Sequence, residues 1–266
     1  ADVSLLGISS APEIMAYSHD GFDGFYYISA SHNPVGHNGF KFGFAGGVLP
    51  NAEAEKARKL FLESIDETLC ERMKGLSASV AEEDYAKVLL HHKSVKNSAL
   101  KYYSHFVMRT AHAAEDFQVP FGVVIDFNGS ARSASIDIPF LRSHGADVWA
   151  VNSIPGQIAH AIVPEGANLE TARKTLEAAH KANPRYVLGY MPDNDGDRGN
   201  FVYISRRGKA KALNAQEVFA LVASIELSHA AMRHPGKRIA IAVNGPTSLL
   251  IDDIAARLGV SVFRSD

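Results

Sequence analysis

Residues 29–34 read Ser-Ala-Ser-His-Asn-Pro and follow an apolar, aromatic run, Phe-Tyr-Tyr-Ile, at residues 25–28. The run predicts a buried strand, and the small polar cluster predicts an abrupt end to it. Because the residue before a proline favours extended or turn geometry, Asn33 should lie in a turn. Ser31 should then lie just past the carboxyl end of the strand, where open α/β sheets bind their ligands. We therefore expect an exposed Ser31 hydroxyl at a binding site.

A lysine lies beyond a second predicted turn, at Asn38 and Gly39. A serine hydroxyl with Lys41 and His32 nearby suits a phosphate, with Ser31 either as the phosphoryl acceptor or as its carrier. The same residue types are ordinary turn formers, so this stretch alone is also compatible with a structural turn. A second polar loop, far along the chain, favours the phosphate site.

Three aspartates alternate along residues 193–198, which read Asp-Asn-Asp-Gly-Asp-Arg and follow an apolar run at residues 186–191. Carboxylates this close repel one another unless a cation lies between them. Oxygen ligands favour Mg²⁺ or Ca²⁺. An EF-hand loop requires glycine at its sixth and glutamate at its twelfth position, but Arg198 and Ile204 stand there. The loop is also compatible with a solvated acidic turn, but we expect a Mg²⁺ site, with a phosphate on Ser31 as a further ligand.

Together the two loops resemble those of the α-D-phosphohexomutase family, which contains the phosphoglucomutases and phosphomannomutases. The phosphoserine loop of that family reads Thr-Ala-Ser-His-Asn-Pro and is followed by Asn-Gly-x-Lys, and its metal loop reads Asp-Gly-Asp-x-Asp-Arg. The first loop is matched at residues 30–34, Asn38, Gly39 and Lys41, with Ser29 in place of threonine. The second is matched at Asp193, Asp195, Asp197 and Arg198. The pair is more specific than either loop alone.

This resemblance implies an isomerase, an intramolecular phosphotransferase of carbohydrate metabolism that moves phosphate reversibly between C1 and C6 of a hexose phosphate, glucose or mannose. Phosphoserine 31 would donate its phosphoryl group to give a hexose bisphosphate, which reorients and returns its other phosphate. The implied catalytic residues are Ser31, His32, Asn33, Lys41 and Arg198. The implied Mg²⁺ ligands are Ser31, Asp193, Asp195 and Asp197.

The resemblance also suggests separate roles for the residues around Ser31. Lys41 would be a proton acceptor or an electrostatic partner, and Arg198 would bind the phosphoryl group. His32 and Asn33 would position the loop and the substrate. Neither loop identifies the residues that recognise the sugar.

Other functions also fit these residues. A metal-dependent phosphatase with a serine nucleophile would pass the phosphoryl group to water. A catalytically silent homologue would bind sugar phosphates without turning them over. A serine hydrolase is disfavoured, because its Gly-x-Ser-x-Gly elbow would need glycine where Ser29 and Asn33 stand.

Composition excludes several classes of partner. The chain of 266 residues is 46% hydrophobic and 21% charged, with a formal net charge of −2 and no basic stripe, so we expect neither nucleic acid nor a membrane as a partner. A single cysteine, Cys70, rules out an internal disulfide and favours a cytoplasmic location. Ala1 in place of methionine indicates a piece of a longer product.

Strands that alternate with helices predict an α/β fold of three-layer α/β/α domains with mixed, mostly parallel sheets. The resemblance implies an incomplete phosphohexomutase fold in three parts. Residues 1–100 would form the later part of a first domain with the serine loop, residues 101–208 a second domain with the metal loop, and residues 209–266 the beginning of a third. Because the family has four domains, we expect this piece alone to be inactive as a mutase.

Some elements have sharper signals. Leu169, Ala172, Leu176 and Ala179 share one face of a predicted helix that begins at Asn168. A helix from Asn214, with Glu217 in capping-box position, should turn Val218, Leu221, Val222 and Ile225 inward. Asn51 should cap a helix over residues 52–65. The turn at Gly129 and Ser130 is either a phosphate cradle or, as we favour, a plain connection.

Overall fold

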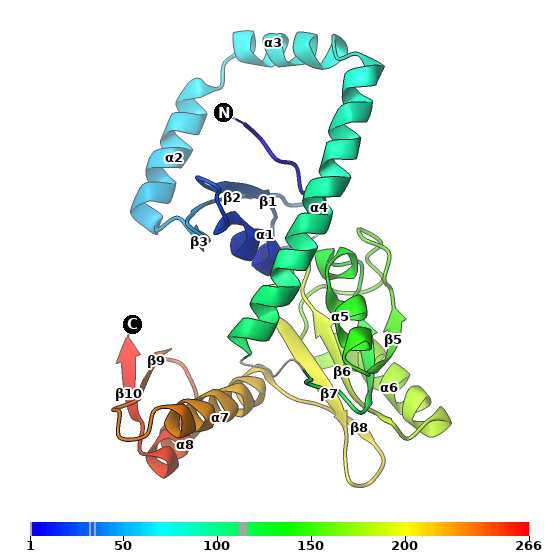
Figure 1. Cartoon of the computed structure of the whole chain (residues 1–266), viewed down its shortest axis with the longest axis vertical. Helices are drawn as coiled ribbons and strands as arrows, with labels where there is room; N and C mark the ends of the chain where they lie inside the picture. The colour runs from blue at the N-terminus through cyan, green and yellow to red at the C-terminus, as the bar shows by residue number, and fades with distance from the viewer. Residues whose placement is uncertain (1, 32, 35, 112–115, 266) are drawn as a thin grey trace.

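The structure is a computed structural model that describes residues 2–31, 33–34, 36–111 and 116–265 (Figure 1). Its strands form a three-stranded, a five-stranded and a two-stranded sheet. The predicted α/β class with mixed sheets is confirmed. The five-stranded sheet lies at the centre of the chain and carries the aspartates.

The first sheet is an antiparallel meander of β1 (Phe25–Ile28), β2 (Phe40–Phe44) and β3 (Gly47–Val48), next to helix α1 (Ala11–Ser18). The prediction of a buried β1 is wrong, because Tyr26 is 46% and Ile28 55% exposed. The exposure of β1 alternates from residue to residue, because successive side chains point to opposite faces of the sheet and one face is turned away from the core.

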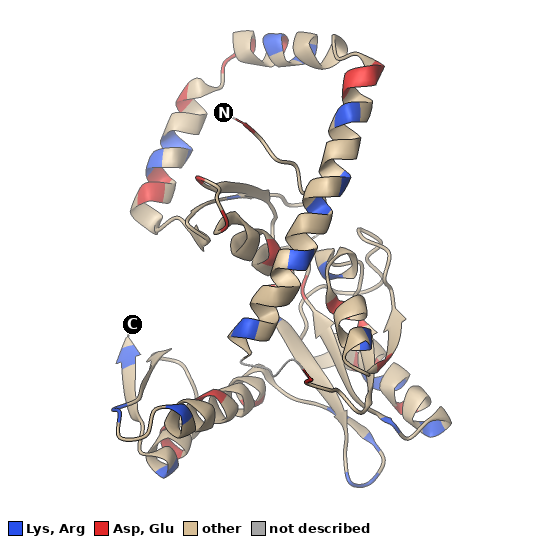
Figure 2. Ribbon diagram, viewed as in Figure 1, with Lys and Arg blue, Asp and Glu red and all other residues tan. Residues whose placement is uncertain are grey.

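Three helices follow: α2 (Asn51–Ser64), α3 (Glu67–Ala78) and α4 (Glu82–Thr110). α2 and α3 bury no residue, and charges of both signs lie along α2 (Figure 2). Asn51 is the first residue of α2 rather than its cap, which is Pro50. No helix in the described ranges has the length and apolar content needed to cross a membrane.

Helices α2, α3 and α4 form an arch, and α4 runs from it back to the centre of the molecule (Figure 1). Its second half buries Val95, Ala99 and Tyr103, and Tyr103 packs with Ala16 of α1. The domain boundary predicted at residue 100 therefore falls within a continuous helix, which joins the first sheet to the second.

The central sheet has the strand order β5-β4-β6-β7-β8. These strands are β4 (Gly122–Asp126), β5 (Asp147–Val151), β6 (Tyr186–Pro192), β7 (Gly199–Ile204) and β8 (Ala210–Ala212). β5, β4 and β6 are parallel, and β7 and β8 are added antiparallel. Because β8 pairs with β7, the boundary predicted after residue 208 separates two paired strands.

Helices cover both faces of this sheet. Short 3₁₀ turns, η1 (Ala131–Ala134) and η2 (Gly166–Leu169), precede α5 (Asp137–Ser143) and α6 (Glu170–Ala182). Val123 and Ile125 of β4 pack on the α5 side, whereas Val124 between them packs on the α6 side. The predicted apolar face of α6 is confirmed, since all four of its residues are at most 1% exposed. The helix itself begins two residues after Asn168.

The last part contains α7 (Ala215–Arg233), β9 (Ala240–Asn244), α8 (Leu250–Leu258) and β10 (Ser261–Ser265), with β9 and β10 parallel. The capping box of Asn214 and Glu217 is confirmed. The predicted inward face of α7 is wrong, because Leu221, Val222 and Ile225 are 47–59% exposed. The buried residues of α7 are Ala220, Ala223 and Leu227. α7 is apolar on several sides, so spacing alone does not select the face that packs.

Replacing Leu176 tests the α6 interface. Leu176→Ala should lower the free energy of unfolding by about 2–5 kcal/mol, because the side chain is fully buried against the central sheet. The only tryptophan, Trp149, lies on β5, so its fluorescence in a urea titration reports unfolding of this sheet. Ile154→Ala, at a loop residue 57% exposed, should cost about 0.5 kcal/mol or less. Equal losses would contradict this assignment of the core.

Candidate functional site

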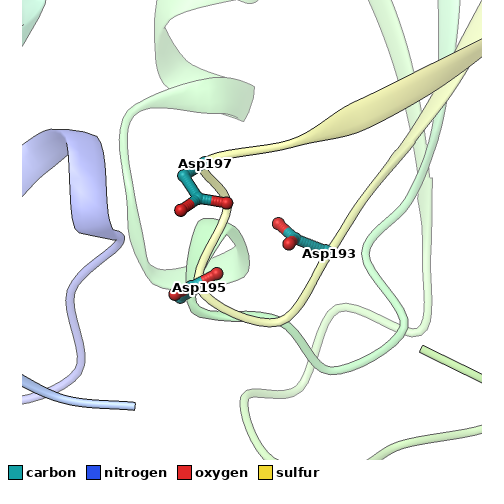
Figure 3. A group of neighbouring side chains, drawn as sticks. All are labelled: Asp193, Asp195 and Asp197. Atoms are coloured by element: carbon teal, nitrogen blue, oxygen red, sulfur yellow. The ribbon is translucent and has the colours of Figure 1, made fainter. Parts of the chain in front are cut away.

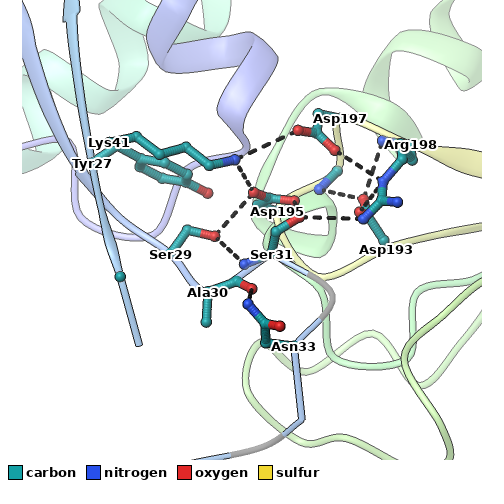
Figure 4. Close-up of polar contacts among 12 residues, drawn as sticks. Tyr27, Ser29, Ala30, Ser31, Asn33, Lys41, Asp193, Asp195, Asp197 and Arg198 are labelled. Atoms are coloured by element: carbon teal, nitrogen blue, oxygen red, sulfur yellow. Dashed lines mark hydrogen bonds and ion pairs between the residues drawn. The ribbon is translucent and has the colours of Figure 1, made fainter. Parts of the chain in front are cut away.

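The two loops singled out by the sequence meet in the structure (Figure 4). Ser31 Oγ donates a hydrogen bond to Asp195 Oδ1 at 3.3 Å, although the two residues are 164 positions apart. Arg198 Nη2 donates to Ser31 Oγ at 3.4 Å. The Ser31 hydroxyl therefore lies between a carboxylate and a guanidinium group.

A tight turn after β1 presents Ser31. The hairpin closes where Ser29 N donates to Gly39 O at 2.9 Å. Ser31 has a left-handed backbone, with φ 51°, and its N–H donates to Ser29 Oγ at 2.9 Å. Asn33 donates to Ala30 O from both its backbone N–H and its side-chain amide, each at 3.0 Å. Asn33 thus supports the turn, and its side chain bonds the backbone of Ala30 rather than the aspartates.

Strand pairing places Lys41 beside this turn. Lys41 lies opposite Tyr27 in the β1–β2 register. Its Nζ lies 2.7 Å from Asp195 Oδ2 and 3.6 Å from Asp197 Oδ2. Partial burial alone would lower the pKa of Lys41, but the hydrogen bond and charge of Asp195, followed by those of Asp197, outweigh it and raise the pKa. The Lys41 ammonium group therefore pairs with the aspartate cluster.

Tyr27, the strand partner of Lys41, lies next to it at the border of the site (Figure 4). Burial, reinforced by the charge of Asp195, raises the pKa of Tyr27 well above its ordinary value. The phenol therefore stays protonated and donates to Ser9 O at 2.9 Å.

The three aspartates lie between β6 and β7 and converge on one point (Figure 3). One carboxylate oxygen from each lies within 4.8 Å of the others. Asp193 and Asp195 are buried, whereas Asp197 is exposed. Burial raises the pKa of Asp193, although the backbone N–H of Arg198 donates to its Oδ1 at 3.1 Å and opposes this shift. The cluster could bind a metal, and its all-oxygen donor set fits a hard divalent cation such as Mg²⁺.

Backbone hydrogen bonds from two sides fix the aspartate loop. Ala11 N, at the start of α1, donates to Asp195 O at 2.7 Å. Ala131 N, at the start of η1, donates to Asn194 O at 2.8 Å. The loop is therefore tied both to the first sheet's helix and to the central sheet.

Arg132, which the sequence analysis did not identify, lies directly beneath this loop. A Cβ atom at Gly196, whose φ is +70°, would be 2.4 Å from Arg132 Cγ and Cδ. Arg132 donates to Asp137 Oδ1 at 2.8 and 3.1 Å and to the Tyr103 hydroxyl at 2.9 Å. Tyr190 also donates to Asp137. Arg132 thus forms a fixed floor for the loop, which no spacing in the sequence would have indicated.

Glu13 is a second residue that the sequence analysis missed. It is fully buried and lies 2.5 Å from Lys96 Nζ on α4. Ser9 Oγ donates to it at 3.2 Å and Ser135 Oγ at 2.9 Å. Glu13 therefore links α1 to α4 and to the loop at Ser135. The sequence does not reveal this link, because a glutamate in the first turn of a helix is ordinarily a favourable surface charge.

The turn at Gly129 connects elements rather than forming a phosphate cradle. Gly129 N donates to Asn152 O at 2.8 Å, so its N–H is already used. The side chain of Asn128 bonds the backbone of residues 159–161. A Cβ at Gly129 would lie 2.6 Å from Gln157 O, which explains the glycine.

Most of the predicted site residues come together in the described part of the chain. Ser31, Lys41, Arg198 and the three aspartates share one polar network (Figure 4). Arg198 Nε also lies 3.2 Å from Asp193 Oδ2. His32 lies outside the described residues.

Comparison with known proteins gives one sequence family. The phosphoglucomutase/phosphomannomutase alpha/beta/alpha domain I matches residues 1–67. The chain is 30% identical over 269 residues to the phosphoglucomutase/phosphomannomutase of Thermococcus kodakarensis, an alignment that covers 99% of this chain and 52% of that protein. The chain thus spans about half the length of the curated relatives it matches.

Solved structures agree on the fold. The phosphoglucomutase/phosphomannomutase family protein from Burkholderia thailandensis aligns with a TM-score of 0.65 at 15% identity, over 99% of this chain and 51% of its own. The Aspergillus fumigatus N-acetylphosphoglucosamine mutase in complex with GlcNAc-6P and magnesium aligns with a TM-score of 0.51 at 14% identity, over 100% of this chain and 63% of its own. Both show the fold of this chain.

Gly196→Ala tests the contact between the aspartate loop and Arg132. Gly208→Ala is a matched control, because both glycines have φ +70° but a Cβ at Gly208 meets nothing within 4 Å. The left-handed backbone should cost each variant about 1–2 kcal/mol, and the clash should cost Gly196→Ala about 1–3 kcal/mol more. Urea unfolding followed by Trp149 fluorescence measures the difference. Equal destabilisation would rule out Arg132 as a rigid floor.

Proposed function

We propose that this chain, which belongs to the α-D-phosphohexomutase family, carries the phosphoryl-donor side of a hexose phosphate mutase. One observation supports the proposal above all others. The Ser31 hydroxyl lies between Asp195 and Arg198, on a turn that the Lys41 ammonium group also borders. This arrangement suits a serine that accepts and returns a phosphoryl group.

The proposed step exchanges one phosphate ester for another. The bond between phosphorus and a sugar oxygen breaks, the bond between phosphorus and Ser31 Oγ forms, and the serine proton leaves with the sugar oxygen. The reverse step returns the phosphoryl group from Ser31 to the free hydroxyl of a hexose monophosphate, which regenerates the bisphosphate and the Ser31 hydroxyl. Because the two steps are alike, one serine serves both directions of an isomerisation.

The negative charge of a phosphate on Ser31 must be balanced by cationic groups around it. A phosphate on Ser31 brings about −1.5 to −2 charge next to Asp195, whose carboxylate lies 3.3 Å from Oγ. Arg198 and Lys41 supply two cationic groups within reach of that phosphate. Mg²⁺ held by Asp193, Asp195 and Asp197 would supply the remaining positive charge that phosphoryl transfer needs.

The substrate class follows from family membership. Relatives named as phosphoglucomutase/phosphomannomutase and phosphoglucosamine mutase support a hexose or hexosamine phosphate as the substrate, and the proposed step makes its bisphosphate the intermediate. Transfer between C1 and C6 is part of this proposal for the whole protein. We also propose that the 266-residue chain alone performs the donor half-reaction rather than complete isomerisation, since it spans about half of those relatives.

A single labelling experiment tests the donor role. Incubation of the chain with glucose 1,6-bisphosphate and Mg²⁺ should add one phosphate, and peptide mapping by mass spectrometry should place it on Ser31. Ser31→Ala should abolish labelling, since loss of a covalent nucleophile costs up to ~10⁶ in rate. Ser64→Ala is the control, because that hydroxyl only bonds Leu60 O on the surface of α2. Labelling of another residue, or continuous release of inorganic phosphate as by a phosphatase, would contradict the proposal.

A further inference from the structure

We propose that Ser29 is a positioning residue for Ser31 and Asp195, an inference that rests on the proposed function of the site. The Ser29 hydroxyl contacts both loops at once (Figure 4). Its Oγ accepts a hydrogen bond from Ser31 N at 2.9 Å and donates one to Asp195 Oδ2 at 3.0 Å. One side chain therefore links the backbone of the phosphoryl-accepting serine to a carboxylate of the aspartate cluster.

The Ser29 hydroxyl donates to Asp195 and accepts from the Ser31 backbone, and it can do both at once. A hydroxyl has one hydrogen to donate, and Ser29 uses it for Asp195. Lys41 donates to the same oxygen of Asp195, at 2.7 Å. With two donors on Oδ2, the carboxylate is held so that Oδ1 faces Ser31 Oγ. Ser29 and Lys41 thus orient Asp195 through the carboxylate oxygen that does not contact the reacting hydroxyl.

The hydrogen bond from Ser31 N to Ser29 Oγ also stabilises the backbone conformation of Ser31. A serine with φ 51° lies in the left-handed region, which costs a non-glycine residue about 1–3 kcal/mol unless its surroundings hold it. The bond from Ser31 N to a hydroxyl two residues earlier closes a serine turn that supports this conformation. Without that acceptor the backbone of Ser31 is free to relax, and Oγ moves away from Asp195 and Arg198.

Ser29 itself is suited to this role by its surroundings. It is half-buried, between the end of β1 and the aspartate loop, where water competes less for its hydrogen bonds than at the surface. Its backbone N–H is held by Gly39 O, so the position of its Oγ is set by the hairpin. Threonine would keep the hydroxyl at the same place, whereas alanine would remove it.

Three variants of the chain test the inference: Ser29→Ala, Ser29→Thr and the surface control Ser64→Ala. Ser29→Ala should slow phosphorylation of Ser31 by glucose 1,6-bisphosphate by about 10–100-fold, and weaken Mg²⁺ binding in calorimetry by a similar factor, as for other residues that orient a metal ligand. Ser29→Thr should restore both quantities. The urea midpoint reported by Trp149 should shift far less than in Leu176→Ala, because Lys41 and Ser31 still donate to the Asp195 carboxylate.

Hydrogen exchange separates this inference from the proposed function. The peptide that contains the Ser31 amide should exchange faster in Ser29→Ala than in the wild type or Ser29→Thr, whether or not Ser31 becomes phosphorylated. A wild type that neither labels nor binds Mg²⁺ would overturn the proposed function, and with it the catalytic part of the inference. Unchanged labelling and exchange in Ser29→Ala, or a failure of Ser29→Thr to restore them, would overturn the role of the Ser29 hydroxyl.

Discussion

The carboxylate of Asp195 is the group on which the rest of the site depends. It is 2% exposed and receives hydrogen bonds from Ser29, Ser31 and Lys41, all of which belong to the hairpin of the first sheet. A buried charge that loses its partners costs about 3–5 kcal/mol. The serine turn is therefore held against the central sheet by the need to satisfy this carboxylate, and the same contact brings the reacting hydroxyl to the aspartate cluster.

Contacts around Asp195 make that meeting point rigid. Ala11 and Ala131 hold the loop backbone, and Gly196 rests on Arg132, which is fixed by its own hydrogen bonds. The ion pair between the buried Glu13 and the partly buried Lys96 ties α1 to α4, the helix that joins the first sheet to the second. Groups that act on a phosphoryl must be held within about 0.5 Å, and such supporting contacts provide that precision.

The sequence predicted what depends on local pattern. Loop composition located Ser31 and the three aspartates, and 3.6-residue periodicity identified the buried face of α6. Periodicity failed for α7, where Leu221 and Val222 are exposed, because a helix that is apolar on several sides has no unique face. The apolar run at residues 25–28 also concealed the exposed side of β1, since such a run does not indicate whether one or both faces of a strand are covered. Arg132, Glu13 and Ser29 act through partners that are remote in sequence or on the facing loop, which no short-range pattern records.

If the two loops form one phosphate and metal site, both groups must be bound at the same place. A crystal structure of the chain phosphorylated on Ser31 and grown with Mg²⁺ tests this most directly. We predict one ion at about 2.1 Å from an oxygen of each of Asp193, Asp195 and Asp197 and from an oxygen of the phosphate on Ser31. An ion bound elsewhere, or three aspartates that turn away from one another at millimolar Mg²⁺, would show that the two loops do not share one site.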